Sequence, residues 1–159
     1  MDELILLTDG SVNTQSNIGY GAYLVVSERG LSLDLLRTRV KVRRFENTSS
    51  TKLELQTLLW ALSDIQALRR RVIVYTDSQN IIGLHGRRDR FEQNDYRSKK
   101  NKCLNNYELY QEFYRMIDQL DCELVKVVGH QPSNKKDYVD GLFSLVDRAS
   151  RNALREDNR

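Results

Sequence analysis

Two aspartates each end an apolar segment that is typical of a buried β-strand. Asp9 ends "LILLTD" (4–9), and Asp77 ends "VIVYTD" (72–77). Ligand sites in open α/β sheets gather at the carboxyl ends of strands, so the two carboxylates would lie side by side if these strands are neighbours. Adjacent carboxylates raise each other's pKa unless a cation neutralises them, and an all-carboxylate site favours a hard cation such as Mg²⁺. The alternative is two unrelated helix-capping or turn aspartates.

A third carboxylate, Glu54, lies in a segment with helical periodicity. Residues 49–68 begin with serines that can cap a helix and place apolar side chains at helical spacing, namely Leu55, Leu58, Leu59, Leu62 and Ile65. Glu54 falls on the border of that apolar stripe, so we expect it to point toward the sheet. Burying a carboxylate without a partner is costly, which favours a role shared with the two aspartates over a solvated helix position.

The remaining segments supply the elements that would position these carboxylates. The length of 159 residues suits one domain, 1–159, with a single core. Further strands are expected at 19–28, 31–45 and 122–128, and further helices from 78 to about 85, at 107–120 and from about 138 to 156. Three early strands followed by two that are reached through helices predict an α/β fold, a mixed sheet flanked by helices.

The positive charge of the chain is concentrated in one segment. The net charge is +3, yet residues 86–106 carry seven Lys/Arg against three Asp/Glu. We expect this segment to be a basic protrusion that favours a polyanionic partner, with a solvated loop as the alternative. A second basic stripe alternates along the strand expected at 31–45, where the residues are Arg37, Arg39, Lys41 and Arg43. Such a stripe is more typical of an edge strand kept soluble by its charge.

The composition excludes several classes of protein. No apolar run approaches the ~20 residues that span a bilayer, and "MDELILLTDGS" does not resemble a signal peptide. Cys103 and Cys122 have no metal-ligand or redox spacing, so both are expected to be reduced thiols. We therefore expect a cytoplasmic protein without membrane association.

Five short blocks carry a resemblance to a known family. In chain order they are "TDGS" (8–11), "GYGAYL" (19–24), "KLEL" (52–55), "YTDSQ" (75–79) and "KVVGH" (126–130). Together they resemble the signature blocks of type 1 ribonuclease H, and the resemblance runs from Leu4 to Leu154. It implies a ribonuclease H-like fold with a five-stranded mixed sheet in the order 3-2-1-4-5. The implied activity is endonucleolytic cleavage of the RNA strand of RNA–DNA hybrids, which leaves 5′-phosphate and 3′-hydroxyl ends.

The resemblance also implies roles for the candidate site residues. Two Mg²⁺ ions, with Mn²⁺ as a possible substitute, would activate water and stabilise the leaving 3′ oxygen. Asp9 would bridge both ions, while Glu54 and Asp77 would bind one each. His130 would lie on a loop beside the metals and relay a proton or help the product leave.

Nine positions are implied to bind the hybrid. They are Gly10, Ser11, Ser50, Thr51, Gln79, Asn106, Arg97, Lys99 and Lys100. A hybrid is distinguished from DNA by its 2′-hydroxyls in a shallow minor groove, which Gln79 could reach. Two departures from the family pattern bear on binding. Ser50 and Thr51 replace asparagines, and the basic segment lacks the family's tryptophans.

The fourth carboxylate is Asp140 or Asp147. The usual family spacing from His130 selects Asp140, whereas the small residues of "DRASRNAL" (147–154) resemble the family's last helix and select Asp147. The two positions share nearly one helix face but lie ~10 Å apart along it, so only one can reach a shared metal. We predict Asp147, with about seven inserted residues before it and Asp137 as the cap of the lengthened helix.

Two rival functions follow from the same resemblance. One is a nucleic-acid-binding module without catalysis, against which the intact set of acids argues. The other is a DNA-acting nuclease of the same superfamily. In each case the expected partner is a nucleic acid and the expected state is a monomer.

Overall fold

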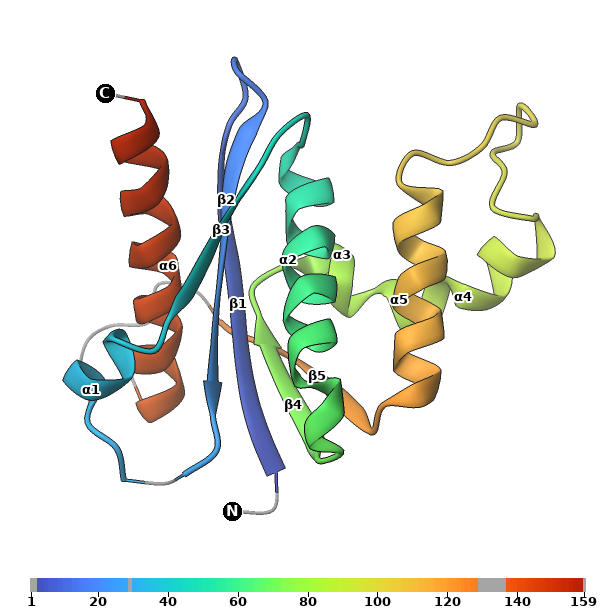
Figure 1. The fold of residues 1–159 in the computed structure, drawn as a ribbon. Coiled ribbons are helices and arrows are strands. Elements are labelled where there is room, and N and C mark those ends of the chain that lie inside the picture. The colour runs from blue at the N-terminus through green and yellow to red at the C-terminus, as the bar shows by residue number, and fades with distance from the viewer. Residues whose placement is uncertain (1–2, 29, 129–136, 159) are drawn as a thin grey trace.

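The computed structural model describes residues 3–28, 30–128 and 137–158. Its sheet has five strands in the order β3-β2-β1-β4-β5, which confirms the predicted order (Figure 1). The strands are β1 Glu3–Asn13, β2 Ile18–Val26, β3 Lys41–Phe45, β4 Arg71–Thr76 and β5 Cys122–Lys126. Antiparallel pairs join β1 to β2 and β2 to β3, while β4 runs parallel to both β1 and β5.

Helices cover both faces of this sheet. They are α1 Leu33–Arg37, α2 Ser50–Ile65, α3 Gln79–Ile82, α4 Leu84–Gln93, α5 Tyr107–Gln119 and α6 Tyr138–Asp157. Figure 1 shows α2 on one face with α5 outside it, and α6 on the other face. The alternation of β1 explains the division, since Leu4 and Leu6 join the core under α2 while Leu7 joins the core under α6. No helix in the described ranges is long and apolar enough to cross a membrane.

The predicted strand over 31–45 is wrong in its first half. Residues 33–37 form α1, whose start is capped by the Ser32 hydroxyl accepting from Leu35 N at 3.2 Å. Leu36 is buried under α6, and an acid in the first turn and a base in the last turn add favourable charge at the helix ends. Local capping therefore overrides the strand pattern, and only Lys41–Phe45 pairs with β2.

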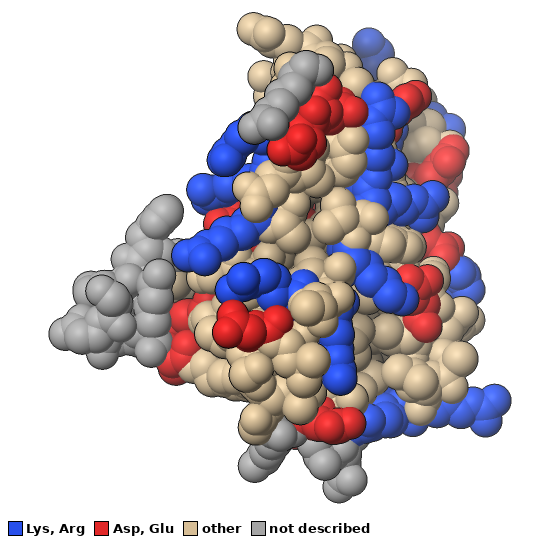
Figure 2. All heavy atoms as spheres, turned by 60° about the vertical axis from the view of Figure 1, so that its left-hand side comes forward, with Lys and Arg blue, Asp and Glu red and all other residues tan. Residues whose placement is uncertain are grey.

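The basic stripe is therefore shorter than predicted and lies at the sheet edge. Strand β3 pairs on one side only, and Lys41 and Arg43 are exposed on it. Arg44 pairs with Glu46 and with Asp157 of α6. On the side of α1 and α6, turned toward the viewer in Figure 2, basic and acidic side chains are interspersed. This arrangement favours the interpretation that β3 is an edge strand whose charges keep the sheet edge solvated.

Close packing of α2 on the sheet depends on glycines in β1 and β2. A Cβ built on Gly21 would lie 2.1 Å from Thr57 Oγ1, and one built on Gly19 would lie 2.7 Å from Leu53 Cδ2. Both distances are shorter than any real contact, so only glycine lets α2 approach this closely. The approach matters because α2 carries Glu54.

The basic segment 86–106 begins within a helix. The helix expected to end at about 85 is replaced by α3 and α4, and α4 continues to Gln93. Arg88 makes two hydrogen bonds to Asp118 of α5, at 2.6 and 2.7 Å, and the Phe91 ring lies 5.2 Å from that of Tyr110. The first part of the basic segment is thus held against α5, and the loop that follows carries Arg97, Lys99 and Lys100.

Candidate active site

Asp9 and Asp77 lie beyond the last paired residues of two neighbouring parallel strands. The β1–β4 pairing ends at Leu7 and Tyr75, and each aspartate comes two residues later. Strand β1 continues to Asn13 along β2, so Asp9 lies where β4 leaves it, rather than at the end of β1 as the sequence suggested. Strand alternation places Asp9 on the side of Leu7, which faces α6, whereas Asp77 follows the end of β4.

Asp147 reaches this pair from α6. Its carboxylate shares a hydrogen bond with Asp9, and its charge acts on both Asp9 and Asp77. Burial first, then the charge of Asp77 and the hydrogen bond with Asp147, raise the pKa of Asp9 to about 8. Asp77 lies at the rim, where partial desolvation and then Asp147 raise its pKa against the opposing effects of its own backbone N–H and Lys126.

Glu54 approaches the same pair from α2. The Ser78 hydroxyl donates to Glu54 Oε2 at 2.5 Å. Burial raises the pKa of Glu54, the Ser78 hydrogen bond lowers it, and the charge of Asp77 raises it further. A small pocket joins the three acids Asp9, Glu54 and Asp77. Its other lining residues are Thr8, Thr57, Thr76 and Ile81.

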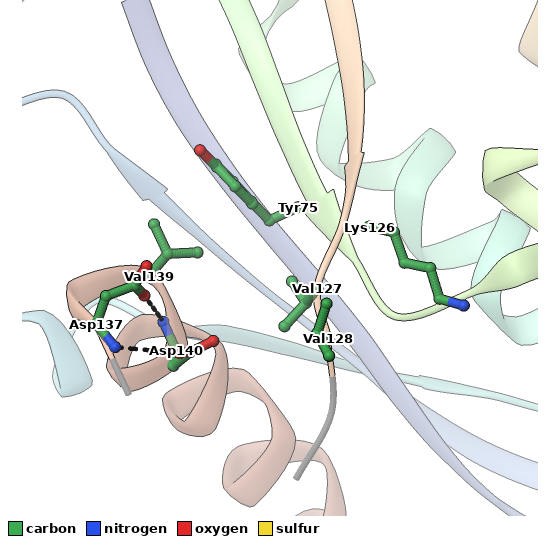
Figure 3. Close-up of a pocket in the computed structure, with 7 residues that line it drawn as sticks. All are labelled: Tyr75, Lys126, Val127, Val128, Asp137, Val139 and Asp140. Carbon is green, nitrogen blue, oxygen red and sulfur yellow. Dashed lines mark hydrogen bonds between the residues drawn. The ribbon is translucent and has the colours of Figure 1, made fainter. Parts of the chain in front are cut away.

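Asp140 is engaged elsewhere. The Asp137 side chain accepts from Asp140 N at 3.0 Å, and Asp140 Oδ2 accepts from Asp137 N at 3.1 Å, so the two form a capping box at the start of α6. Asp137 is thus the predicted helix cap. Figure 3 shows this pair beside Val139, across a pocket from Val127 and Val128. The structure therefore brings Asp147, and not Asp140, to the other carboxylates.

The donor set fits a hard divalent cation. Four carboxylates supply only oxygen ligands, and their mutual repulsion and burial raise the pKa of Asp9, Glu54 and Asp77. Across the described ranges, no three His, Cys, Asp or Glu side chains converge closely enough to hold an ion in their present rotamers. Glu54 is turned to Ser78, and Asp147 Oδ1 is paired with Arg151 Nε at 3.1 Å. Each of these interactions engages one carboxylate oxygen, so both side chains would have to be reoriented or bind a cation through the other oxygen.

The substrate-binding candidates near β1 have protein partners. A Cβ on Gly10 would lie 2.8 Å from Leu53 Cδ2, so this glycine makes room for α2. Ser11 Oγ lies 3.1 Å from the buried Ser150 Oγ of α6, which ties β1 to α6 beside Asp9 and Asp147. Any contact of these two residues with a substrate stays a prediction.

The other candidates lie at or just before the starts of helices. Ser50 and Thr51 form the first turn of α2, and Gln79 begins α3. Asn106 precedes α5 with a positive φ of 66°. In Figure 1 the N-terminus of α2 and the loop before α5 lie at the same end.

The basic loop presents its charges to solvent. Arg97, Lys99 and Lys100 are exposed, and Arg97 Nη1 donates to Asn101 O at 3.2 Å. His130 lies outside the described residues.

Sequence reasoning missed three side chains that contact the site. Ser78 donates a hydrogen bond to Glu54, and Arg151 forms an ion pair with Asp147. The charge of Lys126 opposes the rise in the pKa of Asp77. The four-residue spacing of Asp147 and Arg151 is typical of an ion pair within a helix and could have indicated this contact. No local pattern indicated that Lys126, on a strand 49 residues after Asp77, would lie beside it.

Comparisons with known proteins agree with this geometry. The model of the family described as RNase H matches residues 1–146. That match ends one residue before Asp147, so the choice of fourth carboxylate depends on the structure. No curated protein matches the chain.

Solved structures share the fold at low sequence identity. The solution structure of the PFV RNase H domain has a TM-score of 0.73 at 18% identity, covering 94% of this chain and 92% of that one. Prototype Foamy Virus protease-reverse transcriptase has a TM-score of 0.69 at 17% identity, over 92% of this chain and 20% of that chain. The foamy viral enzyme in complex with an RNA/DNA hybrid has a TM-score of 0.68 at 11% identity, with 94% and 19% covered. On the family match, which spans most of its length, the chain belongs to the ribonuclease H family.

Proposed function

We propose that the protein is a metal-dependent endoribonuclease that cleaves the RNA strand of RNA–DNA hybrids and leaves 5′-phosphate and 3′-hydroxyl ends. The observation that supports the proposal is the clustering of four acids where β4 leaves β1: Asp9, Glu54 and Asp77 line one small pocket, and Asp147 interacts with both aspartates. A module that only binds nucleic acid gains nothing from four acids that repel both one another and a phosphate backbone.

The four carboxylates would hold two Mg²⁺ ions, for which Mn²⁺ could substitute. When bound, the ions would supply an activated water and stabilise the charge on the leaving oxygen. Asp9, which interacts with both Asp77 and Asp147, would hold the ions together with them. Ser78 holds Glu54 near the cluster before an ion arrives. From the sequence we further propose that His130 moves a proton at this site.

Hybrid binding would use two surfaces. Gln79 begins α3 two residues after Asp77, and Ser50 and Thr51 form the turn of α2 before Glu54. Together with Asn106 they would meet the minor groove, where the 2′-hydroxyls distinguish RNA. Arg97, Lys99 and Lys100 would contact phosphates of the DNA strand from the loop before α5. The foamy viral relative is described in complex with an RNA/DNA hybrid, which supports a hybrid as the substrate class.

A substrate panel tests the proposal. Labelled RNA–DNA, RNA–RNA and DNA–DNA duplexes of one sequence are incubated with the protein and Mg²⁺, with EDTA as the control. We expect cleavage of the RNA strand of the hybrid alone. Cleavage of the DNA duplex would instead indicate a DNA-acting nuclease, and binding without any cleavage would indicate a non-catalytic module.

A further inference from the structure

Gln79 and Lys126 are joined by a hydrogen bond at the edge of the acidic cluster. Lys126, the last residue of β5, donates from Nζ to Gln79 Oε1 at 2.8 Å. Gln79 is the first residue of α3, which packs against β5. In Figure 3 the Lys126 side chain leads away from Val127 and Val128 and from the pocket that they line. The alternation of the strand thus directs this lysine to Gln79.

The bond fixes which end of the Gln79 carboxamide is free. An ammonium group has only donors, so the carboxamide oxygen must face Lys126 and the NH₂ group must face away. Both side chains are exposed, and the bond leaves the NH₂ group of Gln79 directed away from Lys126. Without Lys126 the carboxamide could rotate and offer either its donor or its acceptor.

We propose that Lys126 is a positioning residue that presents Gln79 to the minor groove of the hybrid as a hydrogen-bond donor. The proposal rests on the proposed function and adds a determinant of base preference to it. Every base pair offers acceptors on its minor-groove edge, but guanine also carries an amino donor there. A Gln79 held with its NH₂ group toward the groove therefore suits A·T and A·U pairs and disfavours the guanine amino group.

The position of Lys126 beside the cluster supports this role. Its charge acts on Asp77, where it opposes the repulsion from Asp147. Gln79 follows Asp77 by two residues, so the lysine anchors the carboxamide at a fixed place relative to the cluster. The base that it contacts would accordingly lie at a fixed distance from the cut.

A double-mutant cycle separates this role from a direct phosphate contact. The variants are Lys126→Met, Gln79→Ala and the pair, assayed with Mg²⁺ on hybrids randomised around the cut. We expect each single variant to raise KM about three- to tenfold with little change in kcat, and the pair to be no worse than Gln79→Ala alone. Lys126→Met should also relax the base preference at one position, which loss of a phosphate contact or of stability would not do.

The matched control is Lys102→Met, on the exposed loop before α5, whose effect should add to that of Gln79→Ala. The positioning role is wrong if Lys126→Met costs as much in the Gln79→Ala background as in the wild type, or if the base profile does not change. Hybrid affinity is measured in parallel by fluorescence anisotropy in EDTA. If the wild type cleaves no hybrid, the proposed function fails, and the same cycle on affinity and base preference still decides the role of Lys126.

Discussion

At the scale of single residues, the site is a group of carboxylates whose repulsion is only partly offset. Asp9 is surrounded by acids, and its raised pKa, about 8, means that it retains a proton at neutral pH. Arg151 forms an ion pair with Asp147, and the positive charge of Lys126 opposes the rise in the pKa of Asp77. A divalent cation would displace the proton on Asp9, and it would compete with Arg151 if it bound Asp147 Oδ1.

The metal-free protein should therefore lose stability as pH rises. The folded pKa of Asp9, about 8, lies above its usual value of 3.8, so the folded state binds the proton more tightly. This contribution is complete below pH 4 and is lost as pH rises through about 8; partial exposure leaves it on the order of 2–4 kcal/mol. Urea unfolding in EDTA from pH 5 to 9 measures it. Asp9→Asn should flatten the profile, and a wild-type profile that is flat or rises with pH contradicts this origin.

The assignment of the fourth carboxylate predicts unequal effects of two similar substitutions. Asp147→Asn should abolish most hybrid cleavage, because Asp147 contacts Asp9. Asp140→Asn should leave cleavage near the wild-type rate and cost about 1 kcal/mol of stability, since Asp140 belongs to the capping box of α6. Both are assayed at one Mg²⁺ concentration alongside thermal unfolding. Loss of cleavage in Asp140→Asn alone would reverse the assignment.

At the scale of the elements, the active-site geometry depends on how closely α2 and α6 approach β1. Gly19 and Gly21 let α2 bring Glu54 in, and the Ser11–Ser150 hydrogen bond holds α6 where Asp147 reaches Asp9. The helical periodicity of α2 and α6 does not by itself bring Glu54 and Asp147 to the cluster. The closeness of each helix to the sheet sets how near its carboxylate lies to Asp9.

Gly21→Ala should disturb this approach. The added Cβ would meet Thr57 Oγ1 at 2.1 Å, and relieving that overlap by moving α2 should cost about 1–3 kcal/mol and lower Tm by several degrees. The matched control is Gly86→Ala in α4, where a Cβ meets nothing within 4 Å and should stabilise the helix by up to about 1 kcal/mol. Differential scanning calorimetry compares them. Equal Tm values for the two variants would contradict the packing role of Gly21.

Most of the strands and helices, and the order of the sheet, could be predicted from the sequence. The apolar segments before Asp9 and Asp77 predicted the strands, and the sheet order followed from the family blocks. The helix α1 was missed because the alternation of charge in 37–43 resembles a strand, while the Ser32 cap that decides the matter is a local interaction. Partners such as Lys126 depend on long-range pairing of β4 with β5, which periodicity does not encode.

At the scale of the whole molecule, the basic loop and the acidic cluster are separated. The acids lie where β4 leaves β1, whereas the basic loop precedes α5, which lies outside α2 and away from the sheet (Figure 1). A duplex could therefore meet acids on one strand and basic residues on the other. The edge strand β3 carries a comparable positive charge but belongs to the far side of the sheet order.

The salt dependence of hybrid binding should show whether the basic loop before α5 makes the phosphate contacts. Replacing Arg97, Lys99 and Lys100 together by Gln should lower the slope of log K against log [salt] by about 2–3, because each phosphate contact contributes about 0.9. Anisotropy titrations in EDTA between 50 and 200 mM salt measure the slope.

The matched control changes the same charge elsewhere. The triple replacement of Arg37, Arg39 and Lys41 by Gln, in α1 and around β3, should leave the slope unchanged. A larger loss of slope in this control than in the loop variant would place the phosphate contacts on β3 instead.

The most direct test of the central claim is the cleavage of an RNA–DNA hybrid by the wild type and by Asp9→Asn in Mg²⁺. Asp9 interacts electrostatically with two of the other three acids, and replacing it should remove a shared ligand without emptying the core. We predict RNA fragments with 5′-phosphates from the wild type, and a rate at least about a thousandfold lower in the variant, equivalent to about 4 kcal/mol in the barrier. An inactive wild type, or a variant that cleaves at the wild-type rate, would contradict the account.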